Sequence, residues 1–354
     1  MSFSSASSPR LSLIVLASAL LLGGCTVLGK KTPAPLAPQE GQPVASVTIL
    51  AAIAEEGADP KTLSRPEDLS GIMVPLEIIN GGPQGNALTG VKYMQFIRPV
   101  AVAARGNDVF VVDAGQEILF KFDRILGTLT PVMNLRSVAA GEVADIYVAR
   151  DLSFYLVDPL GAQVLQFDRL GRLLQTFKNG LNRPVAVSVD EVSGRVFVAD
   201  GVYDYILVFS STGQLLGSAG GRGSEPGQFL NITAMTQGRD GFYIAARVGQ
   251  RLQVLGDDGR YRYSLPQEDV IFPTAIAVDN DGRVYVGDFS DNAIKIYGEG
   301  RLLGRLGMAG AGLGEFRHIT DLWLDEGLLF VADSMNGRIQ VMRVIPVAQS
   351  QPPN

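Results

Sequence analysis

The amino-acid sequence predicts an all-β fold built from six similar units. A phrase of three apolar or small residues followed by aspartate recurs along the chain, and the interval between copies averages 44 residues. A second alternating run ends nine residues after each copy. The copies end at Asp113, Asp158, Asp200, Ala246, Asp288 and Asp333. Four short strands in each unit of this length, repeated six times, are typical of a six-bladed β-propeller with four-stranded antiparallel blades.

Each element of the unit follows from the local pattern. The constant interval of nine residues indicates a tight hairpin, because a slip of one residue would turn every side chain to the wrong face. An apolar run precedes the phrase, as at residues 185–189, and a run after a glycine turn, as at residues 302–306, supplies the fourth strand. A right-handed parallel solenoid is the alternative, but its coils are usually shorter and lack reversing turns.

The two ends of the repeat region predict how the ring closes. The six repeats span residues 92–345, and the last one lacks a fourth strand of its own. The preceding segment, residues 47–91, contains an apolar stretch at residues 72–79 that we expect to supply the missing outer strand. Residues 47–53 are the competing candidate. Residues 346–354 are expected to form a flexible C-terminal tail.

The first 24 residues have the layout of a secretory signal peptide. Arg10 precedes an uncharged apolar run at residues 11–24 that ends in two small residues. Its fourteen residues are too few to span a hydrocarbon core, which needs about twenty, so a permanent transmembrane helix is disfavoured.

Leu22, Gly23, Gly24 and Cys25 resemble the lipobox of bacterial lipoproteins. The resemblance implies cleavage before Cys25 and a covalent lipid on its thiol. Cys25 is the sole cysteine, so no disulfide or thiolate site remains. Thr26 is not the aspartate that commonly retains lipoproteins at the inner membrane, which implies an outer-membrane anchor, with the protein facing the periplasm. Residues 25–46 contain four prolines and no apolar period, and are predicted to be a flexible tether.

Three segments resemble NHL repeats. They are GGRGSEPGQF at residues 220–229, GMAGAGLGEF at residues 307–316 and VADSMNGRIQV at residues 331–341. The resemblance covers about residues 92–345 and implies an NHL-type six-bladed propeller. Blade four departs from the pattern at Ala246, and blade two lacks the proline found at the start of other inner strands.

Composition excludes several classes of function. A net charge of −6 argues against nucleic-acid binding, which rewards clustered lysine and arginine. One histidine excludes histidine-rich zinc chemistry, and no GxSxG or HExxH motif is present. We therefore expect a non-catalytic scaffold that binds an envelope protein or protein complex, touches the membrane only through its lipid anchor, and needs no other cofactor.

A calcium-dependent lactonase or hydrolase is the alternative. Its resemblance to six-bladed hydrolases that hold calcium in the central channel implies a site made by Asp145, Asn231 and Asp321. The recurring aspartates are interpreted differently, because one in nearly every blade suggests a structural role in which each accepts hydrogen bonds from the following turn. Asp279 and Asp281 similarly favour a hairpin turn over a calcium loop, since no glutamate closes the loop at its twelfth position.

One position in each repeat, just before the inner strand, is predicted to shape a recognition surface. These positions hold Arg98, Val143, Arg183, Asn231, Phe272 and His318, with Arg317 adjacent. A positive rim on an otherwise acidic protein would favour an acidic partner. The alternative is that an arginine before a proline only solvates the end of a strand.

Overall fold

The structure is a computed structural model that describes residues 72–86, 90–249, 251–267 and 269–346. The expected signal peptide, lipobox, tether and residues 47–53 lie outside these ranges, as does most of the C-terminal tail. No helix within them is long and apolar enough to cross a membrane.

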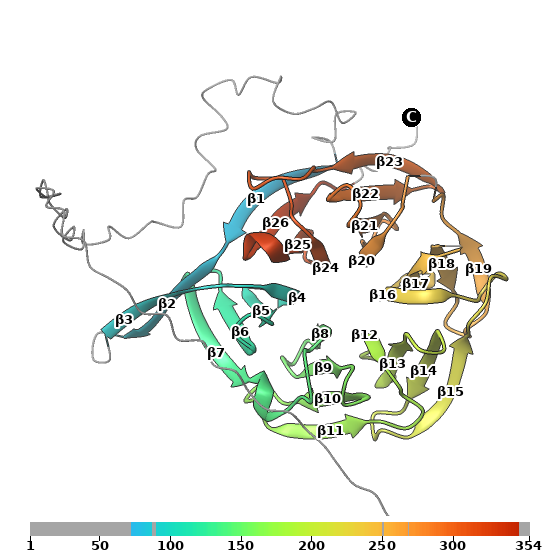
Figure 1. Cartoon of the computed structure of the whole chain (residues 1–354), viewed down its shortest axis with the longest axis horizontal. Coiled ribbons are helices and arrows are strands. Elements are labelled where there is room, and N and C mark those ends of the chain that lie inside the picture. Colours follow the sequence, from blue (N-terminus) through green and yellow to red (C-terminus); the bar gives the residue numbers. More distant parts are fainter. Residues whose placement is uncertain (1–71, 87–89, 250, 268, 347–354) are drawn as a thin grey trace, which may run out of the picture. The chain divides into compact units, whose positions relative to one another are not determined.

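The described residues form six four-stranded antiparallel sheets arranged as blades around a common axis (Figure 1). Blade one contains β4 (Pro99–Arg105), β5 (Asp108–Asp113), β6 (Ile118–Asp123) and β7 (Thr128–Asn134). Blade two contains β8 (Asp145–Val148), β9 (Phe154–Asp158), β10 (Gln163–Phe167) and β11 (Leu173–Phe177). Blade three contains β12 (Pro184–Asp190), β13 (Arg195–Asp200), β14 (Tyr205–Phe209) and β15 (Leu215–Gly220).

The second half of the ring repeats this plan. Blade four contains β16 (Leu230–Gly238), β17 (Gly241–Val248), β18 (Leu252–Leu255) and β19 (Tyr261–Ser264). Blade five contains β20 (Pro273–Val278), β21 (Val284–Asp288), β22 (Ala293–Gly298) and β23 (Arg301–Leu306). Blade six contains β24 (Ile319–Asp325), β25 (Leu328–Asp333) and β26 (Arg338–Val344). Short 3-10 helices follow β7 (Leu135–Ser137) and β25 (Ser334–Asn336).

The ring closes through β1 (Met73–Ile79), which pairs antiparallel with β26 as the outer strand of blade six. The register runs from Met73 opposite Val344 to Ile79 opposite Ile339. The prediction that residues 72–79 supply the closing strand is confirmed. The first and last parts of the repeat region therefore share one sheet.

A hairpin of β2 (Gly81–Asn86) and β3 (Gly90–Gln95) was not expected from the sequence. It follows β1 directly and projects outward beside β7 (Figure 1). The segment Gly-Gly-Pro lacks the apolar alternation by which strands are usually recognised. Gly81 has a φ of 147°, and an added Cβ would lie 2.0 Å from the Met94 carbonyl oxygen, so the close pairing of these strands requires glycine here.

The hydrophobic core is divided into six clusters, each between two neighbouring blades. The second strand of every blade lies inside its sheet, so both of its faces are covered and its residues are almost entirely buried. Large aromatic side chains such as Phe154, Phe209 and Phe330 fill these layers. Because each cluster needs side chains from two blades, no blade buries its apolar faces alone.

Ring closure predicts unequal effects of two neighbouring substitutions in β1. The side chain of Ile79 is 2% exposed and packs between blades six and one, whereas Ile78 is 39% exposed. We expect Ile79→Ala to lower the free energy of unfolding by about 2–4 kcal/mol, because it leaves a cavity in the closing layer. Ile78→Ala, the matched control, should change it by about 0.5 kcal/mol or less. Equal losses in urea unfolding would contradict the role of β1.

Candidate functional site

The side of the ring on which the inner strands begin is called the rim face here, and the opposite side the far face. Because the first and second strands of each blade are antiparallel, the chain also leaves every second strand on the rim face. The six predicted rim positions all lie there. The segments before the inner strands and the turns after the second strands therefore form one surface.

The recurring aspartates hold this surface together. Asp113 accepts hydrogen bonds from the backbone of the following turn, at Gly115 (2.9 Å), as the structural interpretation predicts. It also accepts from the backbone N–H of Ile97 (2.7 Å) and Arg98 (3.1 Å), which lead into β4. Asp200 and Asp288 make the same two kinds of contact in their blades. Each aspartate thus fastens a turn to the start of the inner strand of its own blade.

Blade four, which has Ala246 in this position, obtains its acceptor from a neighbour. Asp204 in the turn of blade three is fully buried and accepts from the backbone N–H of Ile232 at 2.9 Å. In blade six, Asn292 from blade five similarly accepts from the backbone N–H of His318 at 2.6 Å. These contacts cross from one blade to the next, and the sequence pattern within a single repeat does not show them.

Buried cations balance two of the aspartates. Lys295 lies 2.6 Å from Asp288, and Arg338 lies 2.7 Å from Asp333. Burial raises the pKa of Asp288, but the hydrogen bonds from Lys295 and Ser290 outweigh it and lower that pKa to about 2. Asp288 is therefore an ionised structural group, and Lys295 holds it in place.

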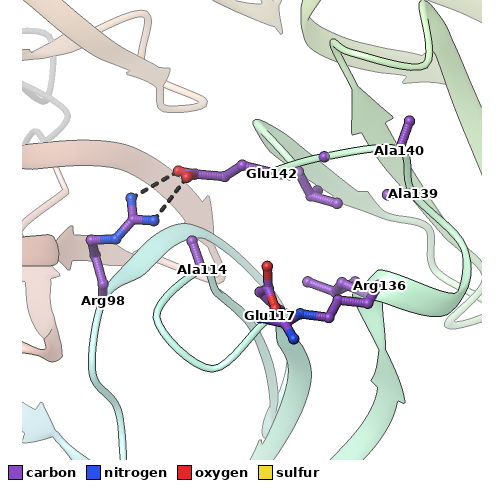
Figure 2. Close-up of a pocket in the computed structure, with 10 residues that line it drawn as sticks. Arg98, Ala114, Glu117, Arg136, Ala139, Ala140 and Glu142 are labelled. Atoms are coloured by element: carbon purple, nitrogen blue, oxygen red, sulfur yellow. Dashed lines mark hydrogen bonds and ion pairs between the residues drawn. The ribbon is translucent and has the colours of Figure 1, made fainter. Parts of the chain in front are cut away.

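Arg98 forms a bidentate ion pair with Glu142 of the next blade, with both nitrogen–oxygen distances at 2.8 Å (Figure 2). This hydrogen bonding raises the pKa of Arg98. The pair borders a cavity of about 220 Å³ between blades one and two, which Val143 and the Arg136–Glu117 ion pair also line. The structure thus brings two predicted rim positions together, but it places the Arg98 charge against a carboxylate.

The remaining predicted rim residues are spread over blades three to six. Arg183 is exposed and donates to the Gly201 carbonyl oxygen at 3.0 Å. Asn231 and His318 are partly exposed and both adopt a left-handed backbone with φ of 62°, while Arg317 is exposed beside His318. Phe272 packs against Phe289.

An aromatic cluster of Phe272, Phe289 and His318 covers blades five and six. Ring centroids lie 5.6 Å apart for Phe272 and Phe289, and 4.8 Å apart for Phe289 and His318. The guanidinium of Arg247 stacks over Phe272 at 4.3 Å. Burial, and then the charge of Arg98, lower the pKa of His318. Sequence reasoning missed Arg247 and Phe289, because Arg247 lies near the end of β17 and Phe289 in the turn after β21, and neither is at the selected position.

Large apolar side chains are exposed all around the rim face. Seven of them are between 45% and 75% exposed: Ile97, Leu160, Tyr203, Val248, Ile271, Phe289 and Met335. They come from all six blades. The sequence carries a signal for four of them, since Leu160, Tyr203, Phe289 and Met335 follow the recurring aspartate, where polar residues are usual. Ile97 and Ile271 precede inner strands, and Val248 is the last residue of β17. On the far face the exposed large apolar side chains include Ile125, Leu126, Leu170 and Val192, over blades one to three.

Asp145 and Asp321, proposed from the sequence as channel residues, occupy equivalent places on blades two and six. Asp145 accepts from its neighbour Ile146 (2.8 Å) and from Val187 of blade three (2.9 Å). Asp321 accepts from Leu322 (2.8 Å) and from Val102 of blade one (2.8 Å). Each carboxylate therefore links its inner strand to the inner strand of the next blade.

The pKa values of Asp145 and Asp321 are both raised, because the two carboxyl groups are buried. Burial and then the charge of Asp321 raise the pKa of Asp145 well above its ordinary value. Burial raises the pKa of Asp321 to about 7, against hydrogen bonds from Val102 and Leu322. Because the charge of Asp321 contributes to the raised pKa of Asp145, the two carboxylates titrate as a pair.

The calcium site of the alternative interpretation stays a prediction. Calcium takes about six to eight oxygen ligands. Within the described ranges, no group of three or more His, Cys, Asp or Glu side chains is placed to hold a metal ion. Asn231 belongs to blade four and makes no hydrogen bond to Asp145 or Asp321 in this part of the chain. Each of the two carboxylates accepts two backbone N–H groups and so links neighbouring inner strands.

Arg105 organises a cluster near the far end of the inner strands. Its guanidinium lies 5.0 Å from the ring of Trp323 and pairs with Glu191 (3.2 Å) and Asp325 (3.3 Å). The rings of Tyr147 and Trp323 meet edge to face at 5.4 Å. Burial and the charge of Glu191 raise the pKa of Tyr147, which keeps its hydroxyl neutral. The cluster joins blades one, two, three and six, and none of its residues was singled out from the sequence.

The raised pKa of Asp321 predicts a pH dependence of stability. A carboxyl group whose pKa is higher in the folded than in the unfolded state destabilises the fold as pH rises through the folded value. We expect the free energy of unfolding to fall between pH 5 and pH 8, and Asp321→Asn to reduce this fall by an amount on the order of 1–3 kcal/mol. Urea unfolding at both pH values measures the free energy of unfolding. Parallel pH profiles for the wild type and Asp321→Asn would contradict the raised pKa of Asp321.

Comparison with known proteins supports the fold and one repeat. Residues 271–297, in blade five, match the NHL repeat family, as the sequence resemblance predicts. No protein of curated function matches the chain in sequence.

Two solved structures are similar in fold to this chain. A structural genomics protein of unknown function from Bacteroides thetaiotaomicron VPI-5482 is 17% identical with a TM-score of 0.58, over 75% of this chain and 72% of that one. Selenomethionine-substituted virginiamycin B lyase from Staphylococcus aureus is 12% identical with a TM-score of 0.53, over 70% of this chain and 94% of that one. At these identities the likeness shows the fold alone: this chain is a six-bladed β-propeller with an NHL repeat in blade five.

Proposed function

We propose that this protein is a lipoprotein anchored in the outer membrane, whose propeller serves as a non-catalytic protein-binding scaffold in the cell envelope. The observation that carries the proposal is the set of seven large apolar side chains exposed on the rim face. Large apolar side chains gathered on one face of a protein are typical of protein interaction sites. The binding surface of the scaffold is therefore the rim face.

The composition of the rim face matches that of protein interfaces. Cores of protein interfaces are enriched in aromatic residues, methionine and arginine. The rim face offers Tyr203, Phe289 and Met335 together with Arg247 stacked on Phe272. The buried aspartates hold the backbone beneath these side chains, so little ordering is needed when a partner docks.

Charge indicates the kind of partner. Arg183, Arg247 and Arg317 lie on the rim face, and none of them belongs to an ion pair within the described residues. Arg98 is neutralised by Glu142, so the uncompensated positive charge lies over blades three to six. This arrangement favours an acidic envelope protein or protein complex, and the charges would act mainly on the encounter rate.

The anchor rests on the first 46 residues. The lipobox-like residues 22–25 supply the lipidation site, and the tether that follows has a reach of roughly 25 Å for about twenty flexible residues. The propeller can then meet partners near the membrane while the lipid holds it there.

Site-specific photocrosslinking tests the binding face. A photoreactive amino acid placed at Met335, on the rim face, should give one discrete crosslinked product in intact cells, because this side chain is 67% exposed within the proposed interface. Val192 on the far face is 95% exposed and is the matched control, which should give none. Adding Arg317→Glu to the Met335 probe should reduce the product most at low salt. A discrete product from Val192 alone would move the interface to the far face.

The anchor is tested separately. Cys25→Ser should abolish palmitate labelling and release the protein from the membrane fraction, because serine cannot form the thioether to the lipid. The released protein should keep the wild-type melting temperature, since Cys25 precedes the propeller by many residues. Palmitate labelling that persists in the variant would contradict the lipidation site.

A further inference from the structure

A cleft of about 260 Å³ lies at the outer edge of the ring between blades three and four, away from the rim-face interface. Its inner wall is apolar: Phe197 and Phe242 meet there with ring centroids 4.3 Å apart, and Ile206 and Leu255 complete the wall. An apolar cavity of about 150 Å³ already accommodates benzene, so this cleft has room for a large apolar side chain.

The cleft exists because Gly217 in β15 has no side chain. The backbone does not require glycine there, since its φ lies outside the left-handed region. Packing does not require it either, because a Cβ built at Gly217 would meet no atom within 4 Å. Glycine inside a strand weakens it and often marks a place where another backbone or a ligand approaches closely. Gly217 therefore leaves open a space that the fold would let a side chain fill.

Neighbouring blades fill the corresponding space. Gly217 pairs with Val208, and the equivalent partners in blades two and four are Gln175 and Tyr263. Gln175 reaches into blade three, where it donates to the Thr212 carbonyl oxygen at 3.1 Å. Tyr263 packs into the core between blades four and five, and its hydroxyl donates to Asp240 at 3.1 Å.

Blade five also has a glycine in this register, Gly304, but its strand fills the gap differently. Gly304 pairs with Ile296, and Leu303 and Leu306 on either side pack into the core between blades five and six. In blade three the corresponding neighbours of Gly217 include Leu216 and Ser218, which are exposed. The open cleft is thus a property of the boundary between blades three and four.

The strand beside the cleft has a free edge. β15 is the last strand of its sheet and pairs only with β14 among the described strands. Its first four residues are exposed. An exposed edge strand is a template for pairing, and peptide-binding domains use such edges, with backbone hydrogen bonds for affinity and adjacent pockets for specificity.

The mouth of the cleft is acidic. Asp257 and Asp258, in the turn between β18 and β19, line it and are exposed. Asp258 forms a long ion pair with the highly exposed Arg260, with 3.9 Å between Oδ2 and Nε. Asp257 has no ion pair within the described residues. Arg195 also lines the cleft, but it is turned to Asp190 at 3.6 Å and stacks on Phe197. Of the charged residues that line the cleft, Asp257 is therefore the one without an ion-pair partner among the described residues.

We propose that this cleft binds an extended, basic segment of a partner protein, which adds to β15 as a fifth strand of blade three. One apolar side chain of the segment fills the space over Gly217. Lysine or arginine residues on the same side of the segment, two positions away, lie beside Asp257 and Asp258, because side chains of a strand alternate between its faces. The site is separate from the rim face, so it stands or falls independently of the scaffold interface.

Fluorescence polarisation with the full chain tests the proposal. The probe is a fluorescein-labelled peptide, Thr-Lys-Val-Leu-Val-Lys-Thr with blocked ends, and we expect saturable binding. Gly217→Val should weaken binding by about tenfold or more, because its side chain occupies the cleft. The variant should melt at or above the wild-type temperature, because a β-branched residue suits a strand and no atom is displaced. Gln175→Val, in the same register of blade two, is the matched control and should bind as the wild type does.

Further measurements separate the occupants. The same peptide with glutamate in place of lysine should bind weakly to the wild type, and Asp257→Asn with Asp258→Asn should remove the preference for lysine. Absence of binding by the lysine peptide, or equal affinities of the wild type and Gly217→Val, would overturn the proposal. Self-association of the wild type in sedimentation that Gly217→Val abolishes would also overturn it, and would identify a second copy of the chain as the occupant.

Discussion

Closure of the ring is the constraint on which the rest of the structure depends. Every core cluster is shared by two blades, so an open ring would leave two blades with an exposed apolar face. The pairing of β1 with β26 removes both faces at once by joining the two ends of the repeat region in one sheet. Closure also fixes the positions of all inner strands around the axis, and hence the surface that their first residues form.

In the closed ring, buried polar groups hold the backbone in place on the rim face and on the far face. On the rim face the repeated aspartates bind the turn and the start of the inner strand, and Asp204 replaces the missing acceptor of blade four from outside it. Near the axis Asp145 and Asp321 link neighbouring inner strands, and Arg105 ties the far end. The recurring aspartates thus have the structural role that their repetition predicts, and Asp145 and Asp321 also bind backbone N–H groups.

Irregularities of the repeat place the two proposed binding surfaces. The rim face becomes apolar because residues such as Leu160 and Met335 occupy turns that need only a few backbone hydrogen bonds and tolerate any side chain pointing outward. The outer cleft arises at one boundary because Gly217 lacks the side chain that Gln175 and Tyr263 supply elsewhere. The repeated fold therefore acquires specific surfaces through single residues that differ from those at equivalent positions in the other blades.

The sequence by itself determined the six-bladed all-β fold and the four-strand unit, because the spacing and alternation of apolar residues can be recognised along the chain alone. It left residues 72–79 and 47–53 as candidates for the closing strand, and the pairing of β1 with β26 decided between them. It also placed Arg98, Arg183 and His318 at equivalent positions. Only the tertiary structure decided that Glu142 neutralises Arg98, that Phe289 and Arg247 join Phe272, and that Asp145 binds Val187. These contacts join different turns and blades, and packing between blades depends on side chains about 40 or more residues apart, which no period within one repeat encodes.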